Sequence, residues 1–343
     1  MKTFTISRND EVYECFPDLV LTPSGRLVLT YRESDGHVAN QYSRLIVRTS
    51  DDTGATWSDR HVLIEGESSP VPRAMPYWNC PRVSVLPDGR IALVCDLFRS
   101  DMPAATQDEA THNYLWFSPD DGATWSDPEE IAPVGIVPDK LHSLASGGWL
   151  FGTHFPDPAT GKLVQRCWLA AEPHARWEGP LTVAAGPDWN LCEGAFVEVK
   201  PGALVCYMRE NSGKGWPAIK ALSTNGGRTW QGPFPTLLPA CHRPASGLTQ
   251  AGELLTCARN MPGPAGTPAP LAFYAAIESA QSALTPTFEG QACRIRVIED
   301  NGGDMGYSGW VEYAPGKFLA AYYTRKEAPK GFIRGVFFDA EDF

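Results

Sequence analysis

Apolar runs separated by a glycine-containing turn recur along the whole chain. The turn glycines fall at positions 25, 89, 147, 202, 252 and 316, about 50 to 64 residues apart. Each copy predicts two antiparallel strands, and the interval leaves room for two further short strands. The copies occupy residues 16–32, 80–96, 139–154, 193–209, 243–259 and 307–325. This pattern predicts an all-β fold, a six-bladed β-propeller, in which residues 3–6 pair with 331–338 to close the ring.

A second repeat lies within the first. Residues 50–57, 118–125 and 223–230 share a Ser, an Asp or Asn, a Gly and a final Trp, and residues 171–177 carry a degraded copy. An Asp or Asn next to Gly supplies the backbone conformation that a tight turn needs. Repetition at this distance indicates one supersecondary unit copied several times. We expect the repeat to stabilise turns and to take no part in chemistry.

Composition narrows the class of protein. A chain of 343 residues with 43% hydrophobic content can bury a large core, and we predict one domain over residues 1–343. The net charge of −11 argues against a nucleic-acid partner. No run of 18 apolar residues predicts a membrane span, and the N-terminus lacks an apolar signal core. We therefore expect a cytoplasmic protein, with secretion left open if the N-terminus was trimmed; the oligomeric state is not readable.

The nine cysteines include no Cys-x-x-Cys pair, which makes a zinc site improbable. We expect buried free thiols in a reducing compartment. No dense run of Asp predicts a calcium site either. No metal and no cofactor are expected.

Ionisable residues gather where each repeat begins and ends. In a propeller the innermost strands converge on one end of the central channel, so these side chains should meet there. Such a ring is either a network of ion pairs or a site, and we interpret it as a site. The strand starts carry Asp18, Arg82, Asp139, Lys140, Glu193, Arg243 and Tyr307, and the strand ends and following loops carry Arg32, Asp35, His154, Arg209, Arg259 and Arg325. Trp78 could stack on a sugar ring or belong to the core.

The repeat at 50–57 and its copies resemble the Asp-box, or BNR repeat, of the sialidase (neuraminidase) superfamily. The resemblance extends to Glu193 followed by Arg209, to Tyr307-Ser308 opening the last blade, and to Arg243 between them. It implies that Tyr307 is a nucleophile and Glu193 its base. It further implies that arginines hold a substrate carboxylate and that an Asp protonates the leaving oxygen.

The chemistry accounts for these residue types. A sialoside carries a carboxylate at its anomeric carbon, which would repel a carboxylate nucleophile. A neutral Tyr avoids the repulsion but needs a base beside it, because its pKa is near 10. Sialidases are an exception to the two-carboxylate pattern of glycosidases. Arginines bind a carboxylate through paired hydrogen bonds.

The chain departs from the superfamily in blade one. The expected Arg-Ile-Pro reads Cys15-Phe16-Pro17, so one arginine of the carboxylate triad is missing. Arg82 or Arg32 could replace it. Asp35 is nearest to the place of the acid, and Asp18 and Asp139 compete with it.

Three functions are compatible with this sequence. The first is an exo-acting glycoside hydrolase that cleaves a terminal sialic acid or a related acidic sugar with retention, through Tyr307. The second is a polysaccharide lyase acting on uronates, with Tyr307, His154 and Arg209 at its centre. The third is a non-catalytic glycan-binding propeller. The first is favoured, because the Tyr and Glu are both present.

Overall fold

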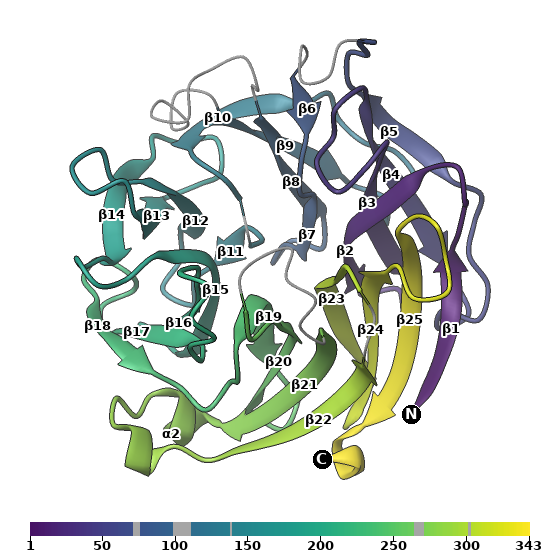
Figure 1. The fold of residues 1–343 in the computed structure, drawn as a ribbon. Helices are drawn as coiled ribbons and strands as arrows, with labels where there is room; N and C mark the ends of the chain where they lie inside the picture. The colour runs from purple at the N-terminus through teal and green to yellow at the C-terminus, as the bar shows by residue number, and fades with distance from the viewer. Residues whose placement is uncertain (71–75, 99–110, 138, 264–270, 301–302) are drawn as a thin grey trace.

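Six antiparallel sheets surround a central axis in this computed structural model (Figure 1). The structure describes residues 1–70, 76–98, 111–137, 139–263, 271–300 and 303–343. In each sheet the strands follow one another from the axis outward, as the repeat of strand, turn and strand requires. The predicted six-bladed β-propeller is confirmed.

The strands of each blade are as follows. Blade one contains β2 (Tyr13–Leu21), β3 (Leu27–Ser34), β4 (Ser43–Ser50) and β5 (His61–Glu65). Blade two contains β6 (Tyr77–Trp78), β7 (Arg82–Val85), β8 (Ile91–Phe98), β9 (Thr111–Ser118) and β10 (Glu129–Val134). Blade three contains β11 (His142–Ser143), β12 (Trp149–Pro156), β13 (Leu163–Ala170) and β14 (Glu178–Ala184). Blade four contains β15 (Leu191–Lys200), β16 (Ala203–Glu210), β17 (Ile219–Ser223) and β18 (Gln231–Pro235).

Blade five contains β19 (Cys241–Leu248), β20 (Glu253–Asn260), β21 (Ala272–Ser279) and β22 (Cys293–Asp300), with the short helix α2 (Ala280–Ala283) after β21. Blade six contains β23 (Met305–Ala314), β24 (Lys317–Thr324) and β25 (Phe332–Asp339), and its fourth strand is β1 (Lys2–Ser7). Lys2 pairs with Phe337 and Thr5 with Arg334, as expected for ring closure. The two ends of the chain therefore hold the same sheet together (Figure 1).

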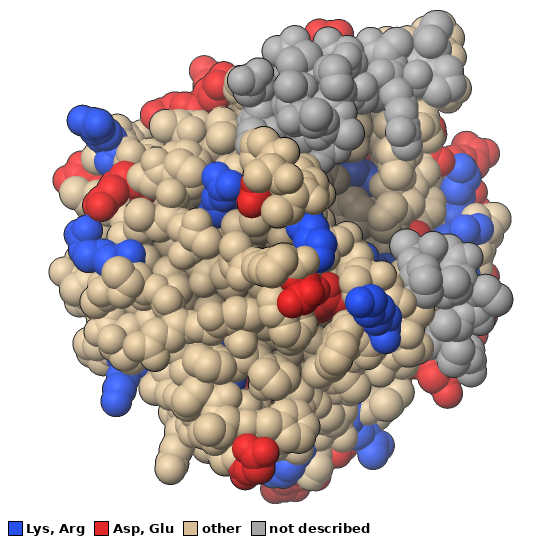
Figure 2. All heavy atoms as spheres, turned by 60° about the vertical axis from the view of Figure 1, so that its left-hand side comes forward, with Lys and Arg blue, Asp and Glu red and all other residues tan. Residues whose placement is uncertain are grey.

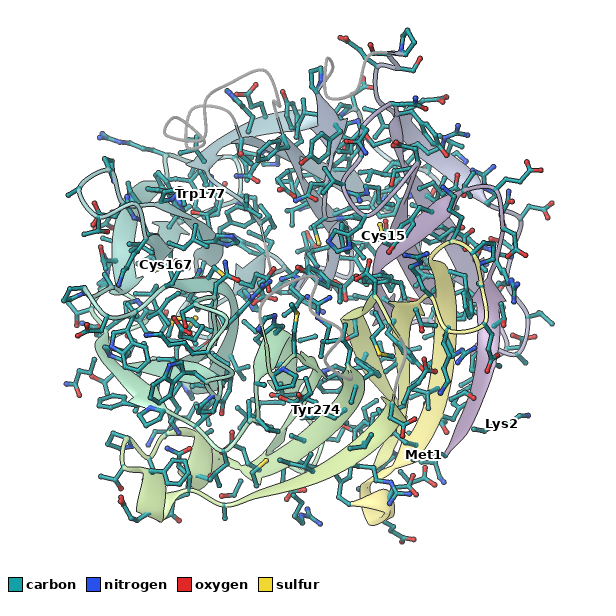
Figure 3. The ribbon with its side chains drawn as sticks, viewed as in Figure 1. Met1, Lys2, Cys15, Cys167, Trp177 and Tyr274 are labelled. Carbon is teal, nitrogen blue, oxygen red and sulfur yellow. The ribbon has the colours of Figure 1, made fainter. Side chains whose placement is uncertain are left out.

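The hydrophobic core lies between neighbouring blades. Alternate residues of a strand face opposite sides of its sheet. On β3, Leu27 and Leu29 pack with Leu319 of blade six, whereas Val28 packs with Leu93 of blade two. Side chains fill the spaces between the sheets all round the ring (Figure 3). Both faces of a blade are thus buried, which explains why the inner strands read as continuous apolar runs.

The Asp-box motifs form the turns that the sequence predicts. In the second box, the Ser118 hydroxyl donates to Asp120 Oδ1 at 3.0 Å and accepts from the Gly122 amide at 2.8 Å. Asp120 in turn accepts from the Thr124 amide at 2.8 Å, and Trp125 Nε1 donates to the Gly122 carbonyl. The first and fourth boxes repeat these contacts. Each box closes a hydrogen-bonded turn on the sheet.

All nine cysteines lie among the described residues and none forms a disulfide; eight are buried and Cys293 is partly exposed. Cys15 and Cys167 lie inside the packed ring (Figure 3). On the face shown in Figure 2, acidic and basic side chains are interspersed, without a broad patch of one sign in its coloured part. No helix in the described ranges has the length and apolar character needed to cross a membrane.

A substitution at Gly122 tests the contact between the second Asp-box, in blade two, and blade one. Its φ is +82°, and a Cβ there would lie 3.1 Å from both methyl groups of Val28 in blade one. We expect Gly122→Ala to lower the free energy of unfolding by about 2–4 kcal/mol, from backbone strain plus overpacking. Gly89→Ala is the control, because its φ is +87° and nothing lies within 4 Å of the added Cβ. Denaturant unfolding measures both; equal losses would mean that the contact between the blades contributes nothing.

Candidate active site

The inner strands of four blades share a local irregularity. Phe16, Glu193, Arg243 and Tyr307 all have positive φ, between +45° and +57°, and the strand pairing of each shifts register there. A bulge re-aims a side chain. The left-handed conformation costs a non-glycine residue about 1–3 kcal/mol and persists only where the surroundings impose it. The same device thus brings side chains from blades four, five and six into contact with one another.

Glu193, Tyr307 and Arg209 form the centre of the site. The Tyr307 hydroxyl donates to Glu193 Oε1 at 2.6 Å. Arg209 Nη1, from the neighbouring strand β16, donates to the same oxygen at 3.1 Å. Glu193 is only 9% exposed. The base and nucleophile suggested by the sequence are therefore within hydrogen-bonding distance, although they lie 114 positions apart in the chain.

Two more arginines face the tyrosine ring. The guanidinium carbon of Arg243 lies 5.5 Å from the ring centroid of Tyr307, and that of Arg259 lies 5.2 Å from it. Both arginines are buried. Arg243 Nη1 and Glu193 Oε2 are among the buried side-chain atoms of the described chain that have no hydrogen-bond partner. A buried guanidinium nitrogen without a partner is costly, so this one is available to bind an acceptor.

The charges set the resting protonation state. Burial raises the pKa of Glu193, but the charges of Arg209 and Arg243 and the Tyr307 hydrogen bond outweigh burial and hold that pKa well below its usual range. Burial and the Glu193 charge raise the pKa of Tyr307 above its ordinary value, despite Arg209 and Arg259. At rest the glutamate is ionised and the phenol keeps its proton.

Blade one contributes an aromatic ring where its neighbours contribute polar groups. Phe16 has the same left-handed bulge and lies 4.7 Å from the Tyr307 ring, centroid to centroid. Arg32 lies over the Phe16 ring, and its guanidinium carbon is 4.5 Å from the ring centroid. Arg32 is fully buried and donates to Asn79 Oδ1 and to the carbonyls of Gly36 and His37. Its guanidinium is thus engaged with the protein itself.

His37 and Asp304 lie beside Tyr307 and were not predicted from the sequence. His37 Nδ1 is 2.9 Å from Asp304 Oδ2, and the two rings of His37 and Tyr307 are 6.2 Å apart. Asp304 also accepts from Tyr13 and Tyr323. Burial raises the pKa of Asp304, but the hydrogen bond and charge of His37 and the two phenols hold it well below its usual range. The available signals were the position of Asp304 three residues before Tyr307 and that of His37 two residues after Asp35.

The acid candidate Asp35 lies on the same loop as His37 but faces its own backbone. Asp35 Oδ1 accepts from the amides of Asn40 at 2.9 Å and Gln41 at 3.2 Å. These bonds shape the loop and hold the Asp35 carboxylate on its own backbone.

Four predicted residues gather elsewhere. Asp18, Arg82, Asp139 and Lys140 line a separate hollow of about 430 Å³, further along the inner strands, to which Glu193, Arg209 and Tyr307 do not contribute. Asp18 is buried and accepts from the amides of Leu19 and Val83. Arg82 donates to the carbonyls of Pro17 and Ser308, so it does not replace the missing arginine beside Tyr307. We therefore leave these four residues out of the candidate active site.

Three other candidates, Trp78, Arg325 and His154, contact other parts of the protein. Trp78 is 5% exposed and packs against Trp116 and Tyr114, so it belongs to the core between the blades. Arg325 is exposed and donates to the Pro329 carbonyl. His154 is buried, and its Nδ1 accepts the Glu193 amide at 3.3 Å. His154 thus helps to hold the backbone of Glu193 in place.

The described residues contain no group of three or more His, Cys, Asp or Glu side chains arranged to hold a metal ion. The chemistry open to the site is that of its own side chains: a phenol paired with a carboxylate, next to arginines. This arrangement can deliver a neutral oxygen nucleophile to an anionic substrate.

The family assignment agrees with this geometry. The profile of the BNR repeat-like domain family matches residues 75–265, more than half of the chain. The chain therefore belongs to the BNR repeat-like domain family, and its propeller is of the sialidase type. No curated protein matches the chain in sequence.

Solved structures share this fold at low identity. A protein of unknown function from Dyadobacter fermentans superposes with a TM-score of 0.80 at 18% identity, covering 99% of this chain and 98% of that one. The Hadza microbial sialidase Hz136 has a TM-score of 0.74 at 20% identity, covering 99% and 68%. The intramolecular trans-sialidase from Ruminococcus gnavus has a TM-score of 0.69 at 13% identity, covering 99% and 97%. At these identities the likeness establishes the fold alone.

His154 should make stability depend on pH. Burial is the main cause that lowers its pKa to about 4, with Arg243 and Arg209 adding to burial and Glu193 opposing it. Between about pH 6.5 and 4 the unfolded chain binds a proton that the folded chain excludes, so stability falls as the pH falls. One such group contributes a slope of up to about 1.4 kcal/mol per pH unit.

We expect His154→Asn, which keeps an acceptor near the Nδ1 position, to reduce this slope of unfolding free energy against pH. The reduction is at most about 1.4 kcal/mol per pH unit, which corresponds to one bound proton. Unfolding free energies measured from pH 7 to pH 4.5 give the slope. His174→Asn is the matched control, since His174 is exposed and pairs with Glu129 at the outer edge. An unchanged slope in His154→Asn would show that His154 is protonated in the folded state.

Proposed function

We propose that this protein is an exo-acting glycoside hydrolase that cleaves a terminal sialic acid or a related 2-keto acid sugar, with Tyr307 as its nucleophile. The observation that carries the proposal is the hydrogen bond of 2.6 Å between Tyr307 and Glu193, whose acceptor oxygen is shared with Arg209. Arg243 and Arg259 lie beside the same phenol ring, and the unpartnered Arg243 Nη1 is available to an anionic ligand, which supports a site rather than a structural ion pair.

The reaction proceeds in two displacements. The Tyr307 oxygen bonds to the anomeric carbon as the bond to the leaving group breaks, and Glu193 accepts the phenolic proton. Water then attacks the anomeric carbon and loses one proton, which balances the proton that the departing oxygen takes up in the first step; the bond to Tyr307 breaks, and Glu193 returns its proton to the phenolate. Two inversions at one carbon retain its configuration.

The substrate's own charge prepares the base. With no substrate, the arginines hold the pKa of Glu193 so low that it is a weak base. A substrate carboxylate bound by Arg243 and Arg209 offsets their charge, which raises the affinity of Glu193 for a proton. The nucleophile is then activated only when an acidic sugar is in place.

The sugar is recognised with fewer arginines than in ordinary sialidases. Phe16 occupies the bulge of blade one, so an apolar ring faces Tyr307 there. Arg243, with its unpartnered Nη1, and Arg209 form the carboxylate clamp, and Arg259 adds charge 5.2 Å from the centroid of the Tyr307 ring. This arrangement favours a 2-keto acid sugar that presents a less polar edge towards blade one.

Tyr307→Phe and Glu193→Gln test the nucleophile and its base. We expect each to lower kcat on aryl glycosides of 2-keto acid sugars by about 10³-fold or more, because the attacking oxygen or its base is lost. Tyr322→Phe is the matched control, since Tyr322 also donates to a buried carboxylate, Glu299, at 2.9 Å. A 3-fluoro glycosyl fluoride should trap a covalent adduct on the Tyr307 peptide in mass spectrometry.

Near-wild-type turnover by Tyr307→Phe would remove this residue from the mechanism. Absorbance of an unsaturated uronate, without hydrolysis of any 2-keto acid glycoside, would identify a lyase instead. A wild-type protein that binds these sugars but neither hydrolyses nor eliminates them would be a binding propeller.

Arg243→Met tests carboxylate recognition, because it removes the charge while keeping most of the volume. We expect kcat/KM to fall by about 10- to 100-fold on the acidic sugar, the worth of a charge-assisted hydrogen bond. The same glycoside with a carboxamide in place of the carboxylate is the control and should lose little. Equal losses on both substrates would indicate that the site has collapsed rather than lost a charge contact.

A further inference from the structure

We propose that His37, held by Asp304, is the general acid and base that protonates the leaving group, in place of the aspartic acid expected on this loop. This assignment rests on the proposed hydrolase function. The departing oxygen needs a proton donor, and in the proposed reaction Tyr307 and Glu193 do not supply one.

Hydrogen bonds from Arg32 and Ser34 fix the backbone of the loop that carries His37. The buried guanidinium of Arg32 donates to the carbonyls of both Gly36 and His37. Ser34 Oγ also donates to the Gly36 carbonyl at 2.8 Å. A charged donor with two carbonyl acceptors on consecutive residues leaves the loop little freedom. The Cα of His37 is therefore positioned by the propeller itself.

The imidazole ring is oriented by a separate set of contacts. Its Nδ1 pairs with Asp304 Oδ2 at 2.9 Å and lies 3.2 Å from the Tyr323 hydroxyl. Its edge meets the Phe16 ring at 5.2 Å and 89°. Asp304 is itself held by Tyr13, Tyr323 and, at 3.5 Å, Arg259. These partners set the ring plane and leave Nε2 with no hydrogen bond among the described residues.

The ring is accessible and adjacent to the nucleophile. His37 is 40% exposed at its side chain, and its ring lies 6.2 Å from that of Tyr307 in an edge-on arrangement. Asp304 can stabilise the imidazolium form, as the carboxylate of a His–Asp pair does in other hydrolases. The charged or titratable groups that face the ring are Asp304, Tyr13, Tyr307 and Tyr323.

The carboxylates near the site are less suited to this role. Asp35 uses its Oδ1 on two backbone amides of its own loop. Asp96 is fully buried and accepts from Asn79 and from the Cys80 amide. Glu193 is already committed to Tyr307. Compared with these three carboxylates, His37 combines an exposed ring with an orientation fixed by Asp304.

Proton transfers balance in both steps. As the glycosidic bond breaks, the Nε2 proton of the His37 imidazolium passes to the departing oxygen, while the Tyr307 proton passes to Glu193. In the second step neutral His37 takes a proton from the attacking water at Nε2, and Glu193 returns its proton to Tyr307. The enzyme ends in its starting state.

The test compares leaving groups. Wild type, His37→Asn and Asp35→Asn are assayed on a glycosyl fluoride or dinitrophenyl glycoside, which departs without a proton, and on a phenyl or alkyl glycoside, which needs one. We expect His37→Asn to lose about 10²- to 10⁴-fold in kcat/KM on the poor leaving group and less than about threefold on the good one. Its activity on the poor substrate should also lose the alkaline limb of its pH profile.

Asp304→Asn should shift that alkaline limb to lower pH while keeping part of the rate, which a purely structural role would not do. His174→Asn is the matched control, a histidine whose Nδ1 also pairs with a carboxylate at 2.8 Å but which lies at the outer edge. Unchanged melting temperatures exclude unfolding as the cause.

Equal losses on both leaving groups in His37→Asn, or no loss on either, would overturn the assignment while the hydrolase stands. Selective loss on the poor leaving group in Asp35→Asn would transfer the role to Asp35. A wild-type protein silent even on the glycosyl fluorides would overturn the proposed function, and the assignment with it.

Discussion

Every blade of this propeller has to bury both faces of its sheet, and the rest of the structure follows from that constraint. A single four-stranded sheet would leave its apolar faces in water, so each is stable only between two neighbours. The ring satisfies this requirement for all six sheets, and β1 joins the last sheet to the start of the chain. The rigid ring is what can impose strained backbone at its centre.

The strained positions are those that carry the side chains of the candidate active site. Glu193, Arg243 and Tyr307 stand at left-handed bulges of successive inner strands, and the same bulge in blade one presents Phe16. The same backbone irregularity therefore brings side chains from several blades together in one site. The chemistry of these side chains decides which ligand the site can bind. Phe16 has the same left-handed backbone as Glu193, Arg243 and Tyr307, so this scaffold accommodates an apolar side chain as well as polar ones.

The electrostatics of the site join substrate recognition to catalysis. Arginines that would bind a carboxylate also hold the pKa of Glu193 low while the site is empty. In the proposed function, the same charges would select an anionic sugar and keep Tyr307 protonated until that sugar binds. Asp304 pairs with His37 as Glu193 pairs with the Tyr307 phenol, so each of these two side chains is oriented by a carboxylate.

The sequence by itself determined the fold and the central pair. Apolar strands at regular intervals, with turn glycines and Asp-boxes, predict six blades because the signals for strands and turns are local. The pairing of Tyr307 with Glu193 was implied by the resemblance to sialidases, and the strand-start positions of both residues agreed with it. Only the tertiary structure separated Asp18, Arg82, Asp139 and Lys140 from this pair, since these four line a different hollow although they too stand near strand starts. It alone placed Trp78 in the core and turned Asp35 onto its own backbone. It also brought His37 to Asp304, 267 positions away, a contact between two loops that no local pattern encodes.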